Sequence, residues 1–235
     1  MIRNFEDFVS ALHNAGFSMS GAMGDGTGNG IYSVINWGWN DSPPHDSPIR
    51  WHTGDPDTDP WEWRMRVLEE RDDIAYAKLF FNKGGFITKE WYPYFLAARR
   101  GGDTFEEAYE NGTISHFAKR IYDVIKECNA IPSHEIKQAA GFTREDKSKF
   151  DRALTELQMK MFITICGRKQ KTSKTGEEYG WSSTAFCIAD NFFGSDVIKK
   201  AAQIDAQEAF DKIKQQVVKL NPSATEAKIK KFIKG

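Results

Sequence analysis

The chain contains 235 residues, of which 40% are hydrophobic and 13% aromatic, so it can bury a sizeable core, and extensive disorder is excluded. It has no run of about 18 apolar residues and no charged-then-apolar start of the kind found in secretory signals, which predicts a soluble, cytoplasmic protein that does not enter a membrane. The three cysteines are odd in number and have no C-x-x-C spacing, so reduced thiols are expected, without a disulfide framework or a cysteine-ligated zinc ion.

The overall net charge of -1 hides an asymmetry along the sequence. Residues 1–112 contain 10 Lys+Arg against 18 Asp+Glu, whereas residues 113–235 contain 22 against 15. An acidic half followed by a basic half suggests two modules with different roles. Only the second half is electrostatically suited to a polyanion such as DNA.

The first module, residues 1–112, is expected to be rich in helix and in tryptophan. Apolar residues at helical spacing predict a helix over residues 4–15. The glycine-rich residues 21–30 lead into the β-favouring residues 31–35, which predicts a hairpin loop, with a ligand-binding loop as the alternative.

Residues 36–63 hold five of the seven tryptophans, on a segment that also contains many prolines and aspartates. Indoles bury large areas, so they are expected to hold a small core together. The alternative is a stacking surface or pocket for a nucleic-acid base. The residues of this possible pocket are Trp51, Trp61, Trp63, Lys78 and Trp91.

The aspartates within residues 55–59 resemble the opening of a calcium loop, but Pro60 and Arg66 stand where that loop needs Gly and Glu. Asp59 is therefore predicted to cap a helix that begins at Pro60 and ends near Glu70. No metal and no cofactor is expected.

The remainder of the first module is predicted to alternate between helix and strand. The pattern indicates a helix from Asp72 to Phe81, a short strand at Phe86-Ile87, a helix from Lys89 to Arg100 with Thr88 as its cap, and a short helix from Thr104 to Glu110. Gly112 then closes the module.

Residues 113–190 are predicted to form a winged helix-turn-helix. Helical spacing indicates a helix over 113–127, a second over 134–140 capped by Ser133, and a longer third helix that begins near Asp146 and carries apolar residues as far as Met161. Two extended segments, 162–166 and 181–187, then flank a basic turn. Helix, turn, helix, longer helix and hairpin follow one another in the order of a winged helix, so duplex DNA is the expected partner.

The exposed face of the third helix is the candidate for the major groove, and the basic hairpin tip is the candidate for phosphate contacts. A solvated hairpin whose lysines only prevent edge pairing is the alternative. The candidate DNA-binding residues are Lys147, Ser148, Arg152, Thr155, Arg168, Lys169, Lys171 and Lys174.

Residues 191–235 are expected to form C-terminal helices that pack on the rest of the protein, with capping boxes at Asp205 and Ser223. The whole chain is thus predicted to be an α+β protein that is mostly helical. Its oligomeric state is not indicated by the sequence.

Five segments carry a resemblance that extends over nearly the whole chain. They are Trp51–Pro56, Asp59–Arg64, Ala75–Lys78, Glu90–Pro93 and Leu154–Gln158. They resemble the bacterial AlkZ-related winged-helix proteins, relatives of the AlkZ (YcaQ-type) DNA glycosylases. The resemblance implies a link to tandem winged-helix enzymes that excise alkylated or cross-linked bases without a metal, using a Q-x-Q or Q-x-D pair in the N-terminal part. This chain has no such pair there, and Gln203-Ile204-Asp205 fits the letters only in the C-terminal region.

Three functions follow as hypotheses. The first is a DNA-binding protein that uses the third helix and the wing. The second is a base-excising DNA repair enzyme, in which Asp55, Asp59 or Glu62 would serve as carboxylates beside the tryptophans. The third is a regulator whose acidic module binds a small-molecule ligand.

Overall fold

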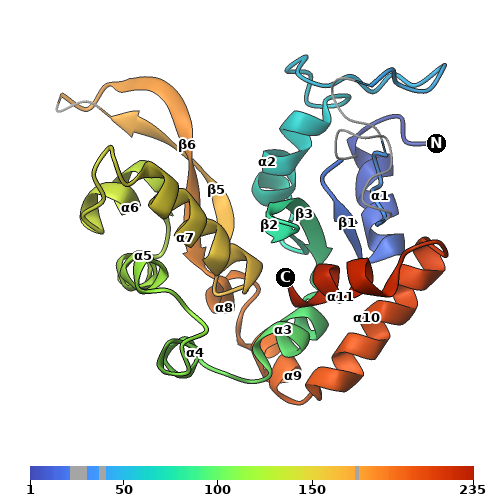
Figure 1. Ribbon diagram of the computed structural model, residues 1–235. Coiled ribbons are helices and arrows are strands. Elements are labelled where there is room, and N and C mark those ends of the chain that lie inside the picture. The colour runs from blue at the N-terminus through green and yellow to red at the C-terminus, as the bar shows by residue number, and fades with distance from the viewer. Residues whose placement is uncertain (22–30, 37–40, 173–174) are drawn as a thin grey trace. The chain divides into compact units, whose positions relative to one another are not determined.

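The structure is a computed structural model that describes residues 1–21, 31–36, 41–172 and 175–235 (Figure 1). The chain forms two compact units, unit 1 with residues 1–102 and 196–235, and unit 2 with residues 103–195. Each unit combines helices with a three-stranded antiparallel sheet, which confirms the α+β class. The predicted boundary after Gly112 falls inside unit 2, and the C-terminal helices belong to unit 1.

Unit 1 is built from both ends of the chain. Its elements are α1 (Phe5–Ala15), β1 (Phe17–Met19), α2 (Pro60–Glu70), β2 (Ile74–Phe80), β3 (Lys83–Thr88), α3 (Tyr92–Arg100), α9 (Ser195–Ala202, which starts at the boundary), α10 (Ala206–Leu220) and α11 (Glu226–Lys234). The predicted first helix is confirmed, because the Asn4 side chain accepts a hydrogen bond from the backbone N–H of Asp7, and Gly16 ends the helix in a left-handed conformation.

The sheet of unit 1 has the strand order β1-β3-β2, so β3 lies in the centre. Its Ile87 pairs with Phe17 on one side and with Ala75 on the other. A two-residue turn, Phe81-Asn82, joins β2 to β3 with φ angles of 52° and 61°. Positive φ at both positions is the geometry that matches the right-handed twist of a tight hairpin.

An aromatic core joins the sheet of unit 1 to its helices. Phe80 of β2 and Phe232 of α11 stack with their ring centroids 4.0 Å apart, and Phe17 of β1 meets Phe95 of α3 edge-on at 5.3 Å. All four side chains are buried. Because Phe80 and Phe232 come from distant parts of the sequence, residues 229–233 complete a core that residues 5–98 begin.

Arg99 of α3 fixes the C-terminal end of α11. Its Nε donates to the carbonyl of Ile233 at 2.8 Å, and its Nη2 donates to the carbonyl of Phe232 at 2.9 Å. The last carbonyls of a helix have no partner within the helix, so this guanidinium supplies the donors that they lack. Burial lowers the pKa of Arg99 to about 9, which still leaves it charged at neutral pH.

The elements of unit 2 are α4 (Phe105–Glu110), α5 (His116–Lys126), β4 (Ile131–Pro132), α6 (Ser133–Ala139), α7 (Lys147–Met159), β5 (Ile163–Thr172), β6 (Glu178–Ile188) and α8 (Ala189–Phe192). The three helices α5, α6 and α7 and the β5–β6 hairpin follow one another in the predicted order, whereas β4 and α8 were not predicted. The sheet has the order β4-β6-β5. The short strand β4 connects α5 to α6, and its residues Ile131 and Pro132 pair with Phe186 and Ala185 of β6. This pairing holds the two-residue connection in an extended conformation.

The core of unit 2 holds α4, α5 and the start of the hairpin together. Phe105 of α4 stacks on Tyr122 of α5 with centroids 3.5 Å apart, and Phe162 meets the Phe105 ring edge-on at 5.3 Å. Ile121 and Leu157, from α5 and α7, are completely buried. These contacts bury the apolar stripes that the sequence showed on α5 and α7.

The predicted helix from Asp72 to Phe81 is wrong, because residues 74–80 form strand β2. Ala75, Ala77 and Lys78 have good intrinsic helix propensity. However, six of the seven strand residues are buried, and their backbone groups pair with β3. A short apolar run that is buried on both faces carries no periodicity that separates strand from helix.

Several predicted boundaries shift. The helix predicted to start at Lys89 starts at Tyr92, since Thr88 ends β3 and donates its hydroxyl to the Gly16 carbonyl instead of capping a helix. Thr225, rather than Ser223, caps α11. Ser133 is the first residue of α6 rather than its cap.

The prediction for residues 31–35 is also wrong. This segment forms only an isolated bridge, between Ser33 and Met19, instead of a strand. The glycine-rich residues 22–30 and the tryptophans at 37 and 39 lie outside the described residues.

Candidate nucleic-acid interface

The start of α7 is organised by Asp146. Its Oδ2 accepts hydrogen bonds from the backbone N–H and the hydroxyl of Thr143 at 3.1 and 2.8 Å, and its Oδ1 pairs with Lys149 Nζ at 2.9 Å. The hydrogen bonds from Lys149 and Thr143 lower the pKa of the Asp146 carboxyl to about 2. The third helix of this segment thus begins where it was predicted, with Asp146 as its N-cap residue and Lys147 as its first residue.

We expect the Asp146 carboxyl to titrate with a pKa of about 2, and Lys149→Ala to raise this pKa toward the ordinary value of 3.8. The folded-state pKa is the lower one, so the contribution of Asp146 to stability is present above pH 3.8 and is lost as the pH falls toward 2. An NMR titration of the side-chain carboxyl carbon measures both values. An unchanged pKa in the variant would mean that Thr143 alone causes the shift.

The predicted DNA-contacting residues of α7 occupy one face of the helix. Lys147, Ser148 and Arg152 are exposed, and Thr155 is half-buried. Lys147 and Arg152 form no ion pair with any other residue that the structure describes. Asp151 lies on the same face, so this face is polar and only moderately basic.

The other side of α7 is held against α5 by Glu156. Its carboxylate accepts from the backbone N–H of Ser115 at 2.8 Å and from the Ser115 hydroxyl at 2.7 Å. The Ser115 hydroxyl in turn accepts from the N–H of Ala118 as the N-cap of α5. One carboxylate therefore fixes the first turn of α5 to α7, and the exposed face of α7 is held on a rigid scaffold.

The basic residues predicted for the hairpin tip lie within strand β5. Arg168 and Lys169 are exposed and stand opposite Thr184 and Ser183 of β6, whereas Lys171 is half-buried. The strands are longer than predicted, so these three side chains are held by a paired backbone instead of a loose turn. Lys174 lies outside the described residues.

A polar cluster that the sequence did not predict joins α6 to this hairpin. His134 Nδ1 lies 2.9 Å from the Ser183 hydroxyl oxygen. Oε1 of Glu135 lies 3.8 Å from His134 Nε2 and 3.6 Å from Lys169 Nζ. The cluster contacts one of the predicted phosphate-binding lysines, and no local sequence pattern could have revealed it, since 49 residues separate His134 from Ser183.

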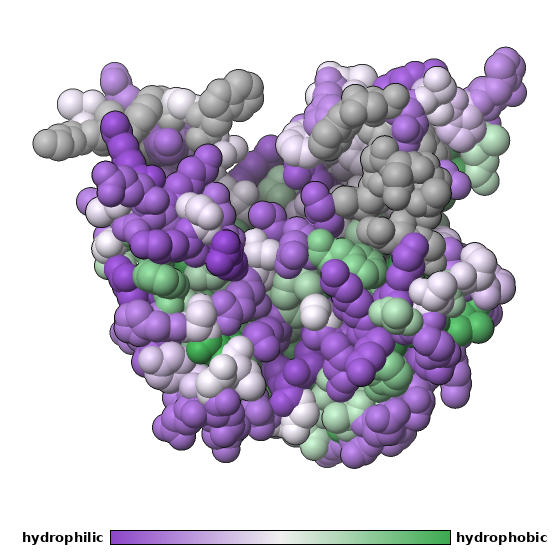
Figure 2. All heavy atoms as spheres, viewed as in Figure 1, coloured by the Kyte–Doolittle hydropathy of each residue, from purple (hydrophilic) through white to green (hydrophobic). Residues whose placement is uncertain are grey.

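The charge asymmetry between the two halves of the sequence is not found between the two folded units. Unit 2 contains 13 Lys+Arg and 14 Asp+Glu, and unit 1 contains 19 of each. The acidic segment 103–110 belongs to unit 2, and the lysine-rich residues 196–235 belong to unit 1. On the visible face of unit 2, the surface over α6, α7 and the hairpin is mainly hydrophilic (Figure 2).

The residues of the possible aromatic pocket differ in burial and in ring contacts. Trp63 is completely buried against Phe8, with centroids 4.8 Å apart, so it is part of the core and cannot stack on a base. Trp91 is half-buried and packs edge-on against Phe17 at 5.5 Å. Lys78 is the exposed residue of β2.

Trp51 and Trp61 are brought together by the ring of His52. The His52 ring centroid lies 4.7 Å from that of Trp61 and 6.4 Å from that of Trp51. Arg64 places its guanidinium 3.3 Å from the Trp61 ring centroid. Among the described residues, no ring contact joins these two indoles to Trp63 or Trp91.

Asp59 holds the loop that carries these rings. It is completely buried, and its carboxylate accepts from the backbone N–H groups of His52, Thr53, Gly54 and Trp61 at 2.8–3.0 Å. The predicted cap of α2 is thus confirmed, with Pro60 in the first turn. Its role extends beyond the helix, because the same side chain folds residues 52–54 back onto the helix start.

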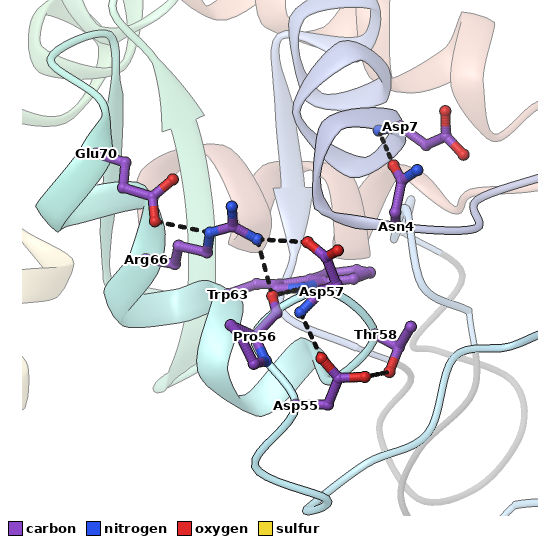
Figure 3. Close-up of polar contacts among 9 residues, drawn as sticks. All are labelled: Asn4, Asp7, Asp55, Pro56, Asp57, Thr58, Trp63, Arg66 and Glu70. Carbon is purple, nitrogen blue, oxygen red and sulfur yellow. Dashed lines mark hydrogen bonds and ion pairs between the residues drawn. The ribbon is translucent and has the colours of Figure 1, made fainter.

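The neighbouring loop is tied to α2 by Arg66, as Figure 3 shows. Arg66 pairs with Asp57 at 2.9 Å and with Glu70 at 2.8 Å, and it donates to the carbonyl of Pro56 at 3.0 Å. Trp63 Nε1 donates to the same carbonyl at 3.0 Å. Asp55 accepts from Thr58 and from the backbone of Asp57, which lowers the pKa of Asp55.

The thiols differ in their surroundings. Cys187 is buried, Cys128 and Cys166 are half-buried, and none of the three forms a disulfide. A hydrogen bond between the two hairpin thiols raises the pKa of Cys187 and lowers that of Cys166.

The Gln203-Ile204-Asp205 match has a structural role at the start of a helix. Asp205 of the Gln203-Ile204-Asp205 match accepts from the N–H groups of Gln207 and Glu208 as the N-cap of α10. Within the described residues, no cluster of three His, Cys, Asp or Glu could hold a metal ion. No helix there is long and apolar enough to cross a membrane.

Comparison with known proteins gives one match. A family model described as AlkZ related matches residues 2–234, a range that includes both units. Comparisons with curated proteins and with solved structures return no significant match. Because the match extends over nearly the whole chain, the protein belongs to the AlkZ-related family.

Proposed function

We propose that this protein binds duplex DNA through unit 2, as a winged helix in which α7 enters the major groove and the β5–β6 hairpin is the wing. The observation that carries the proposal is the order of α5, α6 and α7 followed by a hairpin, with exposed cationic side chains on both α7 and β5. Helix-turn-helix proteins place the last of these helices in the major groove and support it with backbone contacts from neighbouring elements.

The side chains available for such contacts are well placed. Lys147 and Arg152 have no ion-pair partner among the described residues and stand on the solvent face of α7. Within the described part of the chain Lys171 also forms no ion pair, whereas Lys169 Nζ lies 3.6 Å from Glu135 Oε1. Phosphate contacts from these residues would fix the position of the protein on the duplex without reading its sequence.

The charge of unit 2 predicts local rather than long-range attraction. Four of its acidic residues lie in segment 103–110, and residues 113–195 contain 13 Lys+Arg against 10 Asp+Glu. We therefore infer modest affinity, in the range of non-specific binding with a Kd of about 10⁻⁴ to 10⁻⁶ M at physiological salt, unless a preferred sequence is present.

The geometry favours binding over base excision. Of the three carboxylates named for hydrolysis, Asp55, Asp59 and Glu62, two have structural roles: Asp59 is enclosed and satisfied by four backbone N–H groups, and Asp55 holds the turn of its own loop. Neither is free to position a water molecule at a sugar. Family membership alone does not supply the missing Q-x-Q or Q-x-D pair.

A variant that loses four cationic side chains tests the proposal. We expect Lys147, Arg152, Lys169 and Lys171, all changed to alanine, to weaken binding to a fluorescent duplex at least tenfold at low salt. The slope of log K against log salt should become shallower by about 0.9 for each phosphate contact that is lost. Fluorescence anisotropy at several salt concentrations measures both quantities.

The matched control removes the same charge from unit 1. Lys199, Lys219, Lys228 and Lys230 are exposed, and their change to alanine should leave the salt slope almost unchanged. Equal losses in the two variants would show that net charge, rather than unit 2, governs binding. Absence of salt-sensitive binding by the unaltered protein would overturn the proposal.

A further inference from the structure

The cluster between α6 and the hairpin has the form of an occupied anion site. Two nitrogen donors from different elements, His134 Nε2 and Lys169 Nζ, converge on one oxygen of Glu135. The side chains of the three residues are 34%, 57% and 47% exposed, respectively, so the site opens to solvent. Another anion could therefore reach the same donors.

Ser183 fixes the orientation of the histidine. Its hydroxyl lies 2.9 Å from His134 Nδ1, and a hydroxyl that donates to Nδ1 keeps the ring proton on Nε2. In that tautomer Nε2 presents an N–H donor to the site. Ser183 is also the residue opposite Lys169 in the β5–β6 pairing, so the sheet holds both donor groups in place.

Glu135 holds this site loosely. Both distances, 3.6 and 3.8 Å, exceed those of a direct hydrogen bond, which fall at about 2.7–3.2 Å. Exposed ion pairs of this kind contribute little to stability. A phosphate presents several acceptor oxygens and can approach both donors more closely than the carboxylate does.

We propose that His134 and Lys169 form a binding site for a backbone phosphate, positioned by Ser183, and that the Glu135 carboxylate occupies this site until a phosphate displaces it. The inference rests on the proposed function for the source of the phosphate, a DNA strand. It adds a contact from α6 to those from α7 and the wing. It also assigns Glu135 a role as an internal competitor that lowers the affinity for DNA.

The test replaces the competitor with a neutral isostere. Glu135→Gln is expected to strengthen binding to a 20-base-pair duplex about three- to tenfold at low salt, and to steepen the salt slope by about 0.9 because Lys169 is released for one phosphate. The control is Glu127→Gln, an equal change of charge at an exposed residue of the same unit. The double variant Glu135→Gln with Lys169→Ala should lose the gain.

A second probe separates this inference from the proposed function. Inorganic phosphate, titrated into the Glu135→Gln variant, should shift the NMR signals of the His134 ring saturably, and Ser183→Ala should weaken that response. Saturable shifts without any binding to duplex DNA would support the site and overturn the proposed function. Duplex binding that responds equally to Glu135→Gln and Glu127→Gln, with no saturable shift, would overturn the site.

Discussion

Replacing Asp59 with alanine will destabilise unit 1 by about 3 kcal/mol, because an enclosed donor that loses its acceptor costs about 1–3 kcal/mol. Four backbone N–H groups, those of His52, Thr53, Gly54 and Trp61, depend on this one carboxylate. Water can satisfy some of them after the loop opens, which keeps the total below the sum of four penalties. The change also removes the cap of α2.

Urea unfolding followed by tryptophan fluorescence measures this loss well, since six of the seven tryptophans belong to unit 1. The stability of Asp59→Asn should lie between that of the unaltered protein and that of Asp59→Ala, because the amide oxygen can still accept hydrogen bonds but the amide nitrogen cannot. Asp55→Ala, in the exposed part of the same loop, is the control and should cost less. Equal effects at Asp55 and Asp59 would contradict the role given to the buried carboxylate.

Arg99→Ala is expected to destabilise unit 1 by a similar amount, about 3 kcal/mol, through the carbonyls of Phe232 and Ile233 that lose their donor. The aliphatic stem of Arg99 also packs beside Phe80 and Phe95, over whose rings its guanidinium lies at 5.4 Å. Differential scanning calorimetry together with urea unfolding measures the change.

Two further variants assign the cause of this loss. Arg99→Met retains an apolar stem. The difference in the free energy of unfolding between Arg99→Met and Arg99→Ala therefore measures the packing of the stem. The stability that Arg99→Met still lacks relative to the unaltered protein measures the loss of the guanidinium donors. Lys230→Ala, at an exposed position of α11, should be nearly neutral. Full stability in Arg99→Met would show that the α11 carbonyls do not need this guanidinium.

Much of the fold could be predicted because its signals are local. Asn4, Asp59 and Thr104 each cap a helix by accepting from a backbone N–H two or three residues further along the chain, so helices α1, α2 and α4 are placed correctly by sequence alone. Strand β2 cannot be predicted in this way. Its conformation depends on pairing with β3 and on burial of both faces, neither of which leaves a pattern in seven residues.

The candidate interface was predictable to the same extent. Spacing alone placed Lys147, Ser148 and Arg152 on one exposed helix face. It could not show that Trp63 is enclosed by aromatic rings from α1, or that Lys169 forms an ion pair with Glu135. Each of these facts depends on a contact between elements that are distant in sequence. The acidic and basic halves of the sequence also differ from the two folded units, because residues 103–112 lie in unit 2 and residues 196–235 lie in unit 1.

The stacking of Phe232 on Phe80 has a consequence for how the chain acquires its structure during synthesis. Unit 2 is one continuous stretch of the chain, whereas unit 1 is completed only by residues 196–235, which include the Phe232 ring that stacks on Phe80. At about 5–20 residues per second, residues 196–235 follow unit 2 by about 2–8 seconds. During this interval the Phe232 ring does not yet cover Phe80 and Phe95. We therefore expect the nascent chain to expose these apolar rings, which favours aggregation, at a stage when all of unit 2 has already been synthesised.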